Sequence, residues 1–551
     1  MVDKLFRHKG HSHVPEFQSD EDAFMHMEKL LKKRGPNPLL LVLDDVWPHS
    51  EHFLDNFKFQ IPGDKILVTS KSAFPRFGSS YELKPLSDED AMTLFVHSAL
   101  PTNRNSSFLD KSILNEIVNA CRGNPLALTV VGRSLCEQPV AVWHDTFLEL
   151  SKQGPVVEYN SALRNCLQQS LKLLKNNKAT VKECFMDLGL FPEGQWIPAT
   201  ALIDLWVELY ELDEDGVNSI AILRDLHALN LVNLEVRRTD ANEIDGLYND
   251  HFVMQHVLLR QLVNDESSLE PVEQRKRLII EVSGNGFPNW GEEEEKPCVS
   301  ARLLSITTEE ILTPNLFDVQ PPEVEVLVLN VFTKYCMLPE FMKKMEKLKA
   351  LIITNYGFLP PEISNFLLLC SLPNLKSNTT IRLSSAMPNL LEISMDRCID
   401  MKSLPIWFCD LVHLKKLSIS SCWELSELPR EIRKLVNLEV LRLRFCIQLA
   451  KLPETIGSLS KLRILDISDC ASIMQLPNEI GDLYNLRKLY MKGSSISELP
   501  PSIANLNHLQ NVMCDEETTT LWKPFLKNRT DLWIKAGQGG CIYLYYYFSL
   551  S

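Results

Sequence analysis

The sequence predicts a multidomain α/β protein in which a parallel sheet comes first, helical modules follow, and a solenoid of repeats comes last. Three observations predict this order. Two apolar runs typical of buried parallel strands lie within residues 39–71. Segments with apolar residues at helical spacing then continue to about residue 262. Toward the C-terminus, leucines recur at intervals of 24 residues, which indicates a repeat array.

Composition and charge exclude several classes of protein. The chain has 551 residues, of which 45% are hydrophobic, and this length suggests roughly three or four domains. Its formal net charge of −14 argues against broad binding to nucleic-acid phosphates, which requires a basic surface. No run approaches the roughly 18 apolar residues of a membrane span, and the N-terminus lacks the apolar core of a signal peptide. We therefore expect no nucleic-acid partner, no transmembrane segment and a cytoplasmic location, with the nucleus or the membrane periphery as alternatives.

The first predicted strand ends in two carboxylates. Residues 39–43 are five consecutive apolar residues, and Asp44 and Asp45 follow directly. Acids at the carboxyl end of a parallel strand lie where such sheets bind ligands, and this is the Walker B pattern of nucleotide-binding sheets. Asp44 would hold Mg²⁺, and Asp45 would orient the attacking water. The alternative is a buried strand followed by an acidic turn.

A second predicted strand, residues 65–71, ends in Thr69-Ser70-Lys71. These hydroxyls and this cation either contact phosphates or cap the strand. The phosphate-binding loop Gly-x-x-x-x-Gly-Lys-Ser/Thr occurs nowhere in the sequence. Because that loop would precede residue 39, we expect a chain that starts after it.

Helix signals follow the two strands. Ser87 and Asp90 form a capping box at a helix start. The run Gly123-Asn124-Pro125 ends one helix and starts another, with Pro125 in its first turn. Three later segments have the apolar spacing of an amphipathic helix, a strand and a final helix, respectively: 201–206, 231–237 and 258–262.

The C-terminal half repeats every 24 residues. Residues 438–449 match the template Leu-x-x-Leu-x-Leu-x-x-Cys-x-x-Leu of a leucine-rich repeat. The first leucine recurs as Leu414, Leu438, Leu462 and Leu486, and the cysteine recurs as Cys398, Cys422, Cys446 and Cys470. We expect reduced, buried thiols in the turn after each strand of a parallel concave sheet.

Outward positions of these strands are polar: Ser418, Arg442, Asp466, Tyr490, Ser420, Arg444, Ser468 and Lys492. Such a face suits protein recognition, and a solvated surface is the alternative. The array is interrupted, because Leu390 follows Leu372 by only 18 residues. We expect that one or more repeats have lost a piece there.

Five motifs, in this order, resemble those of the NB-ARC switch of plant NLR disease-resistance proteins, most closely the helper subclass: residues 39–47, 65–71, 123–127, 184–192 and 254–256. The resemblance implies a multidomain α/β chain. It would consist of a partial P-loop NTPase-type parallel sheet, helical and winged-helix domains, and a C-terminal leucine-rich repeat solenoid.

The resulting prediction divides the chain into six segments. Residues 1–85 would be a partial nucleotide-binding domain without the phosphate loop, 86–160 a helical ARC1-like domain and 161–275 a winged-helix ARC2-like domain. Residues 276–320 would be a linker, 321–514 the leucine-rich repeats and 515–551 an irregular tail.

The resemblance also implies a site for ADP or ATP with Mg²⁺. Asp44 would bind the metal, and Asp45 would be a vestigial hydrolytic base. The implied cofactor-binding residues are Lys71 at the terminal phosphate, Pro125 at the adenine, Leu126 in the same motif, and His256 at the β-phosphate of ADP. The family has aspartate where this chain has Val257, and losing that charged hydrogen bond would weaken the closed state by about 1.5–3 kcal/mol.

The implied function is plant innate immune defence, with an ADP/ATP switch and repeats that bind other NLR or immune signalling proteins. Oligomerisation is a further expectation. Without the phosphate loop we expect impaired nucleotide binding and no enzymatic activity. Two alternatives stay open: a slow ATPase switch that uses Asp44 and Asp45, and a non-catalytic adaptor whose repeats modulate full-length relatives.

Overall fold

The computed structural model describes the following residues: 24–25, 28–29, 40–43, 46, 54–58, 65–100, 111–151, 164–170, 179–213, 216–236, 251–271, 274–282, 300–308, 322–331, 342, 344–355, 387, 389–398, 401–404, 406–526 and 532–537. The chain divides into two units, residues 1–85 with 542–551, and residues 86–541. Each unit is described by itself.

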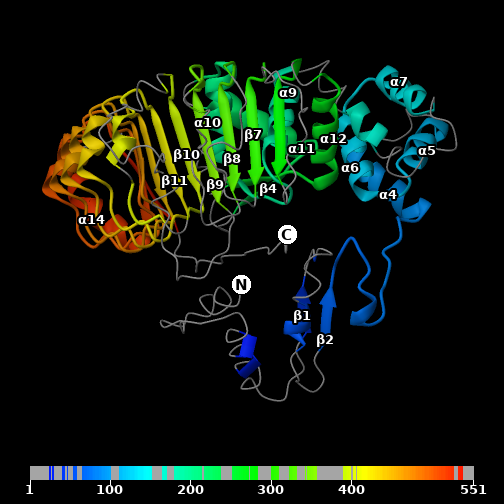
Figure 1. Ribbon diagram of the computed structural model, residues 1–551, viewed down its shortest axis with the longest axis horizontal. Coiled ribbons are helices and arrows are strands. Elements are labelled where there is room, and N and C mark those ends of the chain that lie inside the picture. The colour runs from blue at the N-terminus through cyan, green and yellow to red at the C-terminus, as the bar shows by residue number, and fades with distance from the viewer. Residues whose placement is uncertain are drawn as a thin grey trace, which may run out of the picture. The chain divides into compact units, whose positions relative to one another are not determined.

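The first unit contains a two-stranded parallel sheet (Figure 1), in which β1 (Leu40–Leu43) pairs with β2 (Lys65–Val68). The predicted parallel pair is therefore confirmed. Burial on both faces is wrong, because Leu40, Val42 and Leu67 are 59%, 51% and 51% exposed. A strand is buried on both faces only when a layer covers each face, and the described residues of this unit do not supply two such layers.

The second unit begins with four helices: α4 (Asp88–Ala99), α5 (Lys111–Ala120), α6 (Pro125–Leu135) and α7 (Val140–Ser151). The capping box is confirmed, because Ser87 Oγ accepts from the backbone N–H of Asp90 at 3.2 Å and donates to Asp90 Oδ2 at 2.7 Å. Helices α4 and α6 pack closely at Gly132, where an added Cβ would lie 2.9 Å from Ser98 Cβ. The predicted start of α6 at Pro125 is also confirmed.

A second group of elements, which we call the α9–α12 module, spans residues 179–268. It comprises α9 (Ala179–Asp187), η5 (Leu188–Leu190), β3 (Ile197–Pro198), α10 (Ala199–Tyr210), α11 (Val217–Ala228), β4 (Asn233–Val236), β5 (His251–Met254) and α12 (Val257–Ser268). The three strands form an antiparallel sheet in the order β3-β5-β4. The predicted helix at 201–206 is confirmed, but it is not amphipathic: ten of the twelve residues of α10 are buried.

The rest of the second unit is a parallel sheet of eleven strands in sequence order (Figure 1). They are β6 (Arg277–Val282), β7 (Leu303–Thr308), β8 (Val326–Val331), β9 (Ala350–Asn355), β10 (Glu392–Asp396), β11 (Lys416–Ser420), β12 (Val440–Arg444), β13 (Ile464–Asp466), β14 (Lys488–Tyr490), β15 (Asn511–Asp515) and β16 (Trp533–Gly537). We call it the repeat sheet.

The repeat sheet is longer than the leucine spacing predicted. The segment 276–320, expected to be a linker, contributes β6 and β7. The tail expected from residue 515 contributes α14 (Glu516–Leu526) and β16. Apolar residues that alternate along these strands fill the same core, although they lack the leucine template that would have identified them.

The interruption of the array lies between strands β9 and β10. Strand β9 pairs directly with β10, with Ala350 opposite Glu392. Opposite residues on these two strands are thus 42 positions apart, whereas opposite residues on β10 and β11 are 24 apart, and residues 356–386 lie outside the described part. The predicted loss of a piece of repeat falls on these residues and stays a prediction.

In the regular turns of the solenoid, the repeat cysteines are buried as predicted. Cys398, Cys422, Cys446 and Cys470 are all 0% exposed and free. The residue before each cysteine has a positive φ, between 54° and 63°: Arg397, Ser421, Phe445 and Asp469. The flank of the stack is built by η9 (Ile406–Asp410), η10 (Arg430–Lys434), η11 (Glu454–Ser458), η12 (Asn478–Asp482) and η13 (Pro501–Asn505).

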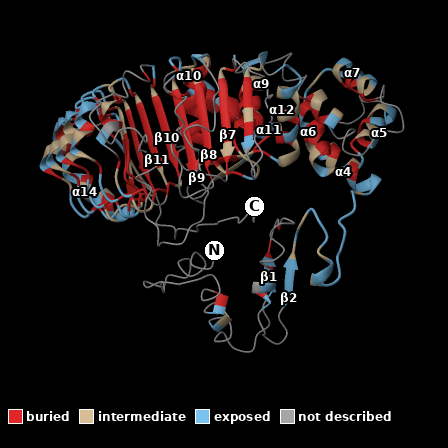
Figure 2. Ribbon diagram, viewed as in Figure 1, coloured by how far each residue is buried: buried red, intermediate tan, exposed pale blue. Residues whose placement is uncertain are grey.

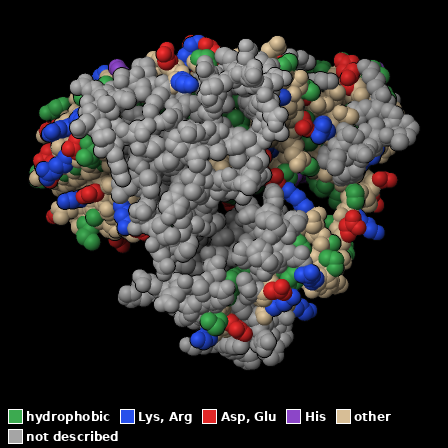
Figure 3. All heavy atoms as spheres, in the orientation of Figure 1, with side chains coloured by type: hydrophobic (Ala, Val, Ile, Leu, Met, Phe, Trp, Pro, Cys, Tyr) green, Lys and Arg blue, Asp and Glu red, His purple; other side chains and the backbone are tan. Residues whose placement is uncertain are grey.

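Exposed ion pairs link neighbouring turns on this flank. Lys434 Nζ lies 2.8 Å from Asp410 Oδ1, and Arg430 Nη2 lies 3.5 Å from Glu454 Oε2. On the face drawn in Figure 3, side chains of both signs are intermixed over the coloured surface. Exposed pairs of this kind contribute little to stability because water screens them.

Candidate functional site

The concave face of the first repeats is covered by the α9–α12 module. Each strand of the repeat sheet has one row of side chains inside the solenoid and one row on the concave face. In β7 to β9 the concave row includes Leu303, Val326, Val328, Ala350 and Ile352, each at most 2% exposed. These side chains belong to the hydrophobic core of the α9–α12 module and not to the core of the solenoid. Figure 2 shows strands β7 to β10 as almost continuously buried. We call the contact between the module and strands β6 to β12 the joint.

Hydrogen bonds at the centre of the joint converge on one carbonyl. Ser305 Oγ on β7 donates to Leu190 O at 2.5 Å, and Asn330 Nδ2 on β8 donates to the same oxygen at 3.1 Å. Thr354 Oγ1 on β9 in turn donates to Asn330 Oδ1 at 2.7 Å. Three successive strands thus recognise the end of η5, which satisfies a backbone carbonyl that has no intrahelical partner.

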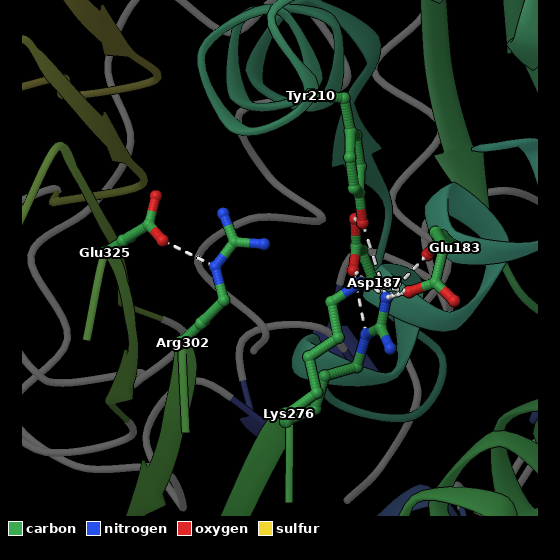
Figure 4. Close-up of polar contacts among 7 residues, drawn as sticks. Glu183, Asp187, Tyr210, Lys276, Arg302 and Glu325 are labelled. Atoms are coloured by element: carbon green, nitrogen blue, oxygen red, sulfur yellow. Dashed lines mark hydrogen bonds and ion pairs between the residues drawn. The ribbon is translucent and has the colours of Figure 1, made fainter. Parts of the chain in front are cut away.

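A cluster of charged residues closes one side of the joint (Figure 4). Arg277, the first residue of β6, reaches Asp187 Oδ1 at 2.7 Å and Glu183 Oε2 at 2.8 Å, both on α9. Tyr210 of α10 donates to Asp187 Oδ2 at 2.8 Å, and Lys276 Nζ lies 2.5 Å from Glu183 Oε2. The cluster therefore ties α9, α10 and the first repeat strand together.

Burial and charge act in opposite directions in this cluster. Burial would raise the pKa of Glu183, but the hydrogen bond from Lys276 and the charge of Arg277 lower it below its ordinary value. Burial raises the pKa of Asp187, although Arg277 and the hydrogen bond from Tyr210 oppose that rise. Arg277 is 6% exposed and carries the charge that makes both carboxylates tolerable in this interior.

A separate ion pair connects the end of the module to the sheet. Arg260 of α12 donates from Nε to Phe191 O at 2.6 Å and contacts Glu281 of β6 at 2.7 Å through Nη2. Arg260 is 8% exposed, so its guanidinium is held inside the joint.

A second charged cluster closes the other side of the joint. Asp204 and Glu208 lie one turn apart on α10, and they face Lys416 of β11 and Arg442 of β12. Arg442 Nη1 donates to Asp204 Oδ2, and Lys416 Nζ lies 3.5 Å from Asp204 Oδ1 and 3.4 Å from Glu208 Oε1. A fifth charged residue, Glu392 of β10, lies in the same interior and is 2% exposed.

These contacts decide between the two interpretations of the polar repeat face for part of its length. Ser418 and Arg442 are each 6% exposed, and Arg442 Nη1 also donates to Ser418 Oγ at 3.2 Å. A solvated surface is therefore wrong at these positions. Here the polar face recognises a protein surface, and that surface is α10 of the same chain.

The nucleotide residues predicted from sequence fall in two separate units. Asp44 and Asp45 lie outside the described residues, and Lys71 is an exposed residue after β2 in the first unit. Pro125 and Leu126 open α6 in the second unit, where Asn124 caps the helix through a hydrogen bond from the N–H of Ala127 at 3.1 Å. The complete nucleotide site stays a prediction.

His256 lies in the second unit as the N-cap of α12. Its Nδ1 accepts from the N–H of Leu258 at 3.2 Å. The neighbouring Gln255 is 6% exposed, and neither its amide oxygen nor its amide nitrogen has a hydrogen-bond partner within the described part of the chain. His256 is thus an exposed residue at a helix N-terminus, a position that favours an anion.

Sequence reasoning missed the residues of the joint. Asp187 lies inside a motif that was recognised, but its pairing with Arg277, ninety positions away, has no local signal. Asp204 and Glu208 are the one detectable hint, because they are acids spaced by four in a helix that is otherwise almost entirely apolar. Glu392 and Lys416 also occupy outward strand positions, but they are not among the outward residues named from the sequence.

The described residues contain neither a metal-binding cluster nor a membrane-spanning helix. No group of three or more His, Cys, Asp or Glu side chains there has an arrangement that would hold a metal ion. In the same residues, no helix combines the length and the apolarity that crossing a bilayer requires.

Comparison with known proteins identifies the family. Residues 455–532 match the model described as a leucine-rich repeat region. Over 403 residues the chain is 41% identical to the probable disease resistance protein At5g66890 of Arabidopsis thaliana, and the match covers 66% of this chain and 95% of that protein. This chain belongs to the plant disease resistance proteins of the NLR type.

Longer relatives give the same result. The probable disease resistance protein At5g66900 of Arabidopsis thaliana is 39% identical over 461 residues, which cover 75% of this chain and 55% of that protein. At5g66910, from the same plant and with the same description, is 38% identical over 439 residues, covering 72% and 53%. The chain therefore spans about half the length of these two relatives.

Proposed function

We propose that this protein acts in plant innate immune defence as a switch whose off state is the closed joint. In this proposal the α9–α12 module is the winged-helix domain of the switch, and the repeats hold it closed. The observation that carries the proposal is the shared core: apolar side chains of β7 to β9 pack with the module and not with the solenoid. A contact between two modules that can open is a bistable element, which is what a switch requires.

A charge exchange at the joint tests this proposal. Arg442→Glu would place a carboxylate against Asp204 and should open the joint, because two like charges in a buried contact repel strongly. The double variant Asp204→Arg with Arg442→Glu restores the attraction between these two positions but repels Lys416, so it should close the joint in part. Hydrogen exchange of the α10 amides measures opening, and defence-gene expression in leaf cells measures signalling.

We expect faster exchange and higher expression for the single variant, and values between those of the single variant and the wild type for the double variant. Arg463→Glu is the control, because Arg463 pairs at 3.7 Å with Glu439 outside the joint and is 27% exposed at its side chain. Equal exchange of α10 in the wild type and in Arg442→Glu would refute the closed joint as the off state.

We also propose that the switch is linked to ADP or ATP with Mg²⁺. Asp44 would bind the metal, Asp45 would be the vestigial base, and Lys71, Pro125, Leu126 and His256 would contact the nucleotide. The exposed position of His256 at the N-terminus of α12 supports this, because helix N-termini favour phosphate. The sequence has no phosphate loop, so we expect weak binding and no turnover.

Calorimetric titration with Mg²⁺ and ADP tests the nucleotide part. Asp44→Ala should abolish the weak binding, and Asp55→Ala, at an aspartate that pairs with Lys58 at 2.7 Å, is the control. A submicromolar Kd together with ATP hydrolysis that depends on Asp45 would favour the alternative of an active ATPase switch.

Partners of the repeats would be other disease resistance proteins or immune signalling proteins. Exposed apolar side chains on the repeats, Tyr484 at 58% and Met474 at 62%, are suitable contact residues. Replacing both with alanine should reduce recovery of the partner in a pull-down. Unchanged recovery would place the contact elsewhere.

A further inference from the structure

The second charged cluster of the joint contains unequal numbers of acids and bases. Three carboxyl groups meet there, from Asp204 and Glu208 on α10 and from Glu392 on β10. Two cations face them, Lys416 on β11 and Arg442 on β12. The strand on the other side of β10 places Ala350 opposite Glu392, so β9 adds no charge at that register. With every group ionised, the cluster would carry a net charge of −1.

This interior is poorly suited to an uncompensated charge. Glu392, Asp204, Lys416 and Arg442 are between 2% and 8% exposed. A buried carboxylate without a partner is so unfavourable that the group usually takes up a proton instead. One proton on one of the three carboxyl groups would therefore neutralise the excess negative charge.

The pattern of contacts identifies the group that carries this proton. Asp204 contacts both cations, and Glu208 contacts Lys416. No ion pair to Glu392 is found among the described residues, and its Oε2 is buried without a hydrogen-bond partner there. Burial, together with the nearby carboxylate of Asp204, raises the pKa of Glu392 well above its ordinary value, whereas Arg442 and Lys416 lower that of Asp204 despite its burial.

We propose that the closed joint holds one proton on Glu392 and releases it when the joint opens, so that the joint is a proton-linked latch. The proposal rests on the proposed function in one respect, namely that the joint opens during signalling. It adds a chemical input that the nucleotide and the partners do not provide. At lower pH the latch is closed, and rising pH favours the open state.

The sign follows from linkage. In the open joint, Glu392 is hydrated and has its ordinary pKa of about 4.3. In the closed joint its pKa is higher, so between the two values the closed state binds one more proton than the open state. Within that window each unit of pH rise shifts the equilibrium about tenfold toward the open state. Below the ordinary pKa both states are protonated, and the dependence on pH ends.

The proton itself can be observed by infrared spectroscopy of the whole chain. At neutral pH the wild type should show the band of a buried protonated carboxyl, and Glu392→Gln should lack it. Glu208→Gln leaves two acids with two bases, so it should weaken the band without changing Glu392. Glu424→Gln, at a half-buried residue outside the cluster that accepts from Gln448 at 3.2 Å, is the control and should keep the band.

Opening is measured by hydrogen exchange of the α10 amides in wild type and Glu392→Gln, compared at each pH so that intrinsic exchange rates cancel. The ratio of wild-type to variant opening should rise about tenfold per pH unit within the window. A wild-type spectrum without a band sensitive to Glu392→Gln would overturn the latch, even if α10 opens. If the band is present but the ratio stays constant with pH, Glu392 is protonated as proposed, but its proton is not linked to the opening of the joint. Failure of the proposed function would appear separately, as an α10 that does not respond to Arg442→Glu.

Discussion

Arg277 compensates the charge of two carboxylates in the cluster of Figure 4. Arg277→Met would remove the cation and leave Asp187, which is 0% exposed, in the interior. Breaking a buried pair in this way costs about 3–5 kcal/mol, which we expect as a loss in the free energy of unfolding by urea.

Arg302→Met is the matched control on the next turn. Arg302 bonds to Glu325 through Nε at 2.5 Å, but its side chain is 40% exposed. Removing it should cost less than about 1 kcal/mol. A loss at Arg277 no larger than that at Arg302 would mean that the cluster does not stabilise the joint.

Val257 gives a second prediction at the scale of one residue. It is the first residue of α12, where a negative charge interacts favourably with the helix dipole. Val257→Asp should therefore stabilise the module by about 0.3–1 kcal/mol, measured by thermal unfolding. The same charge at the other end of α12, in Ser268→Asp, should be unfavourable, and stabilisation by both changes would argue against this explanation.

At the residue scale, sequence predicts positions that local chemistry determines. Ser87, Pro125 and the repeat cysteines were predicted correctly because each satisfies a cap, a helix start or a turn within a few residues. The ion pairs of the joint were not predicted, because Asp204 and Arg442 are 238 positions apart and no periodicity relates them.

The 3-10 helices η11 and η12 of the solenoid stack closely on the next turn at Gly457 and Gly481, respectively. In η11, a Cβ added at Gly457 would lie 2.5 Å from Glu479 O of the next turn, which is backbone and cannot move aside alone. Gly457→Ala should separate the two turns and destabilise the protein by about 1–3 kcal/mol, as overpacking does.

Ser458→Ala, at the next and exposed residue, is the control and should be nearly neutral. The measurement is the urea midpoint, together with hydrogen exchange of η11 and η12. Equal midpoints for Gly457→Ala and the wild type would show that the turns have more room than their backbone separation indicates.

At the element scale, the 24-residue step predicts β11 to β14 because the first two leucines of the template recur in each of these repeats, from Leu414 and Leu417 to Leu486 and Leu489. It misses β6, β7 and β16. Leu278 of β6 and Leu304 of β7 are in register with the template leucine Leu441, but the first and third leucines of the template are absent around them. It also does not predict the pairing of β10 with β9, because opposite residues on these strands are 42 positions apart. The burial expected for β1 is wrong for a different reason, namely that burial depends on neighbouring layers.

At the scale of the whole second unit, the shared core makes two modules interdependent. The concave row of β7 to β9 completes the interior of the α9–α12 module, so neither part retains its buried surface when the other unfolds. Cooperative unfolding requires this kind of mutual burial. The same dependence explains how a change in the repeats reaches the module without a separate connecting element.

This interdependence predicts that α9–α12 and β6–β9 unfold together. Followed by hydrogen exchange in increasing urea, both segments should lose protection at the same concentration.

Val328→Asp should uncouple them, because it places a charge in the module core while Leu327 and Leu329 still fill the solenoid. The module should then unfold at lower urea than the repeats. Ile464→Asp is the control, because Ile464 is also at a concave position but lies outside the module core. In this variant both segments should still lose protection at the same urea concentration, as in the wild type. Separate midpoints in the wild type would show that the shared core does not couple the two modules.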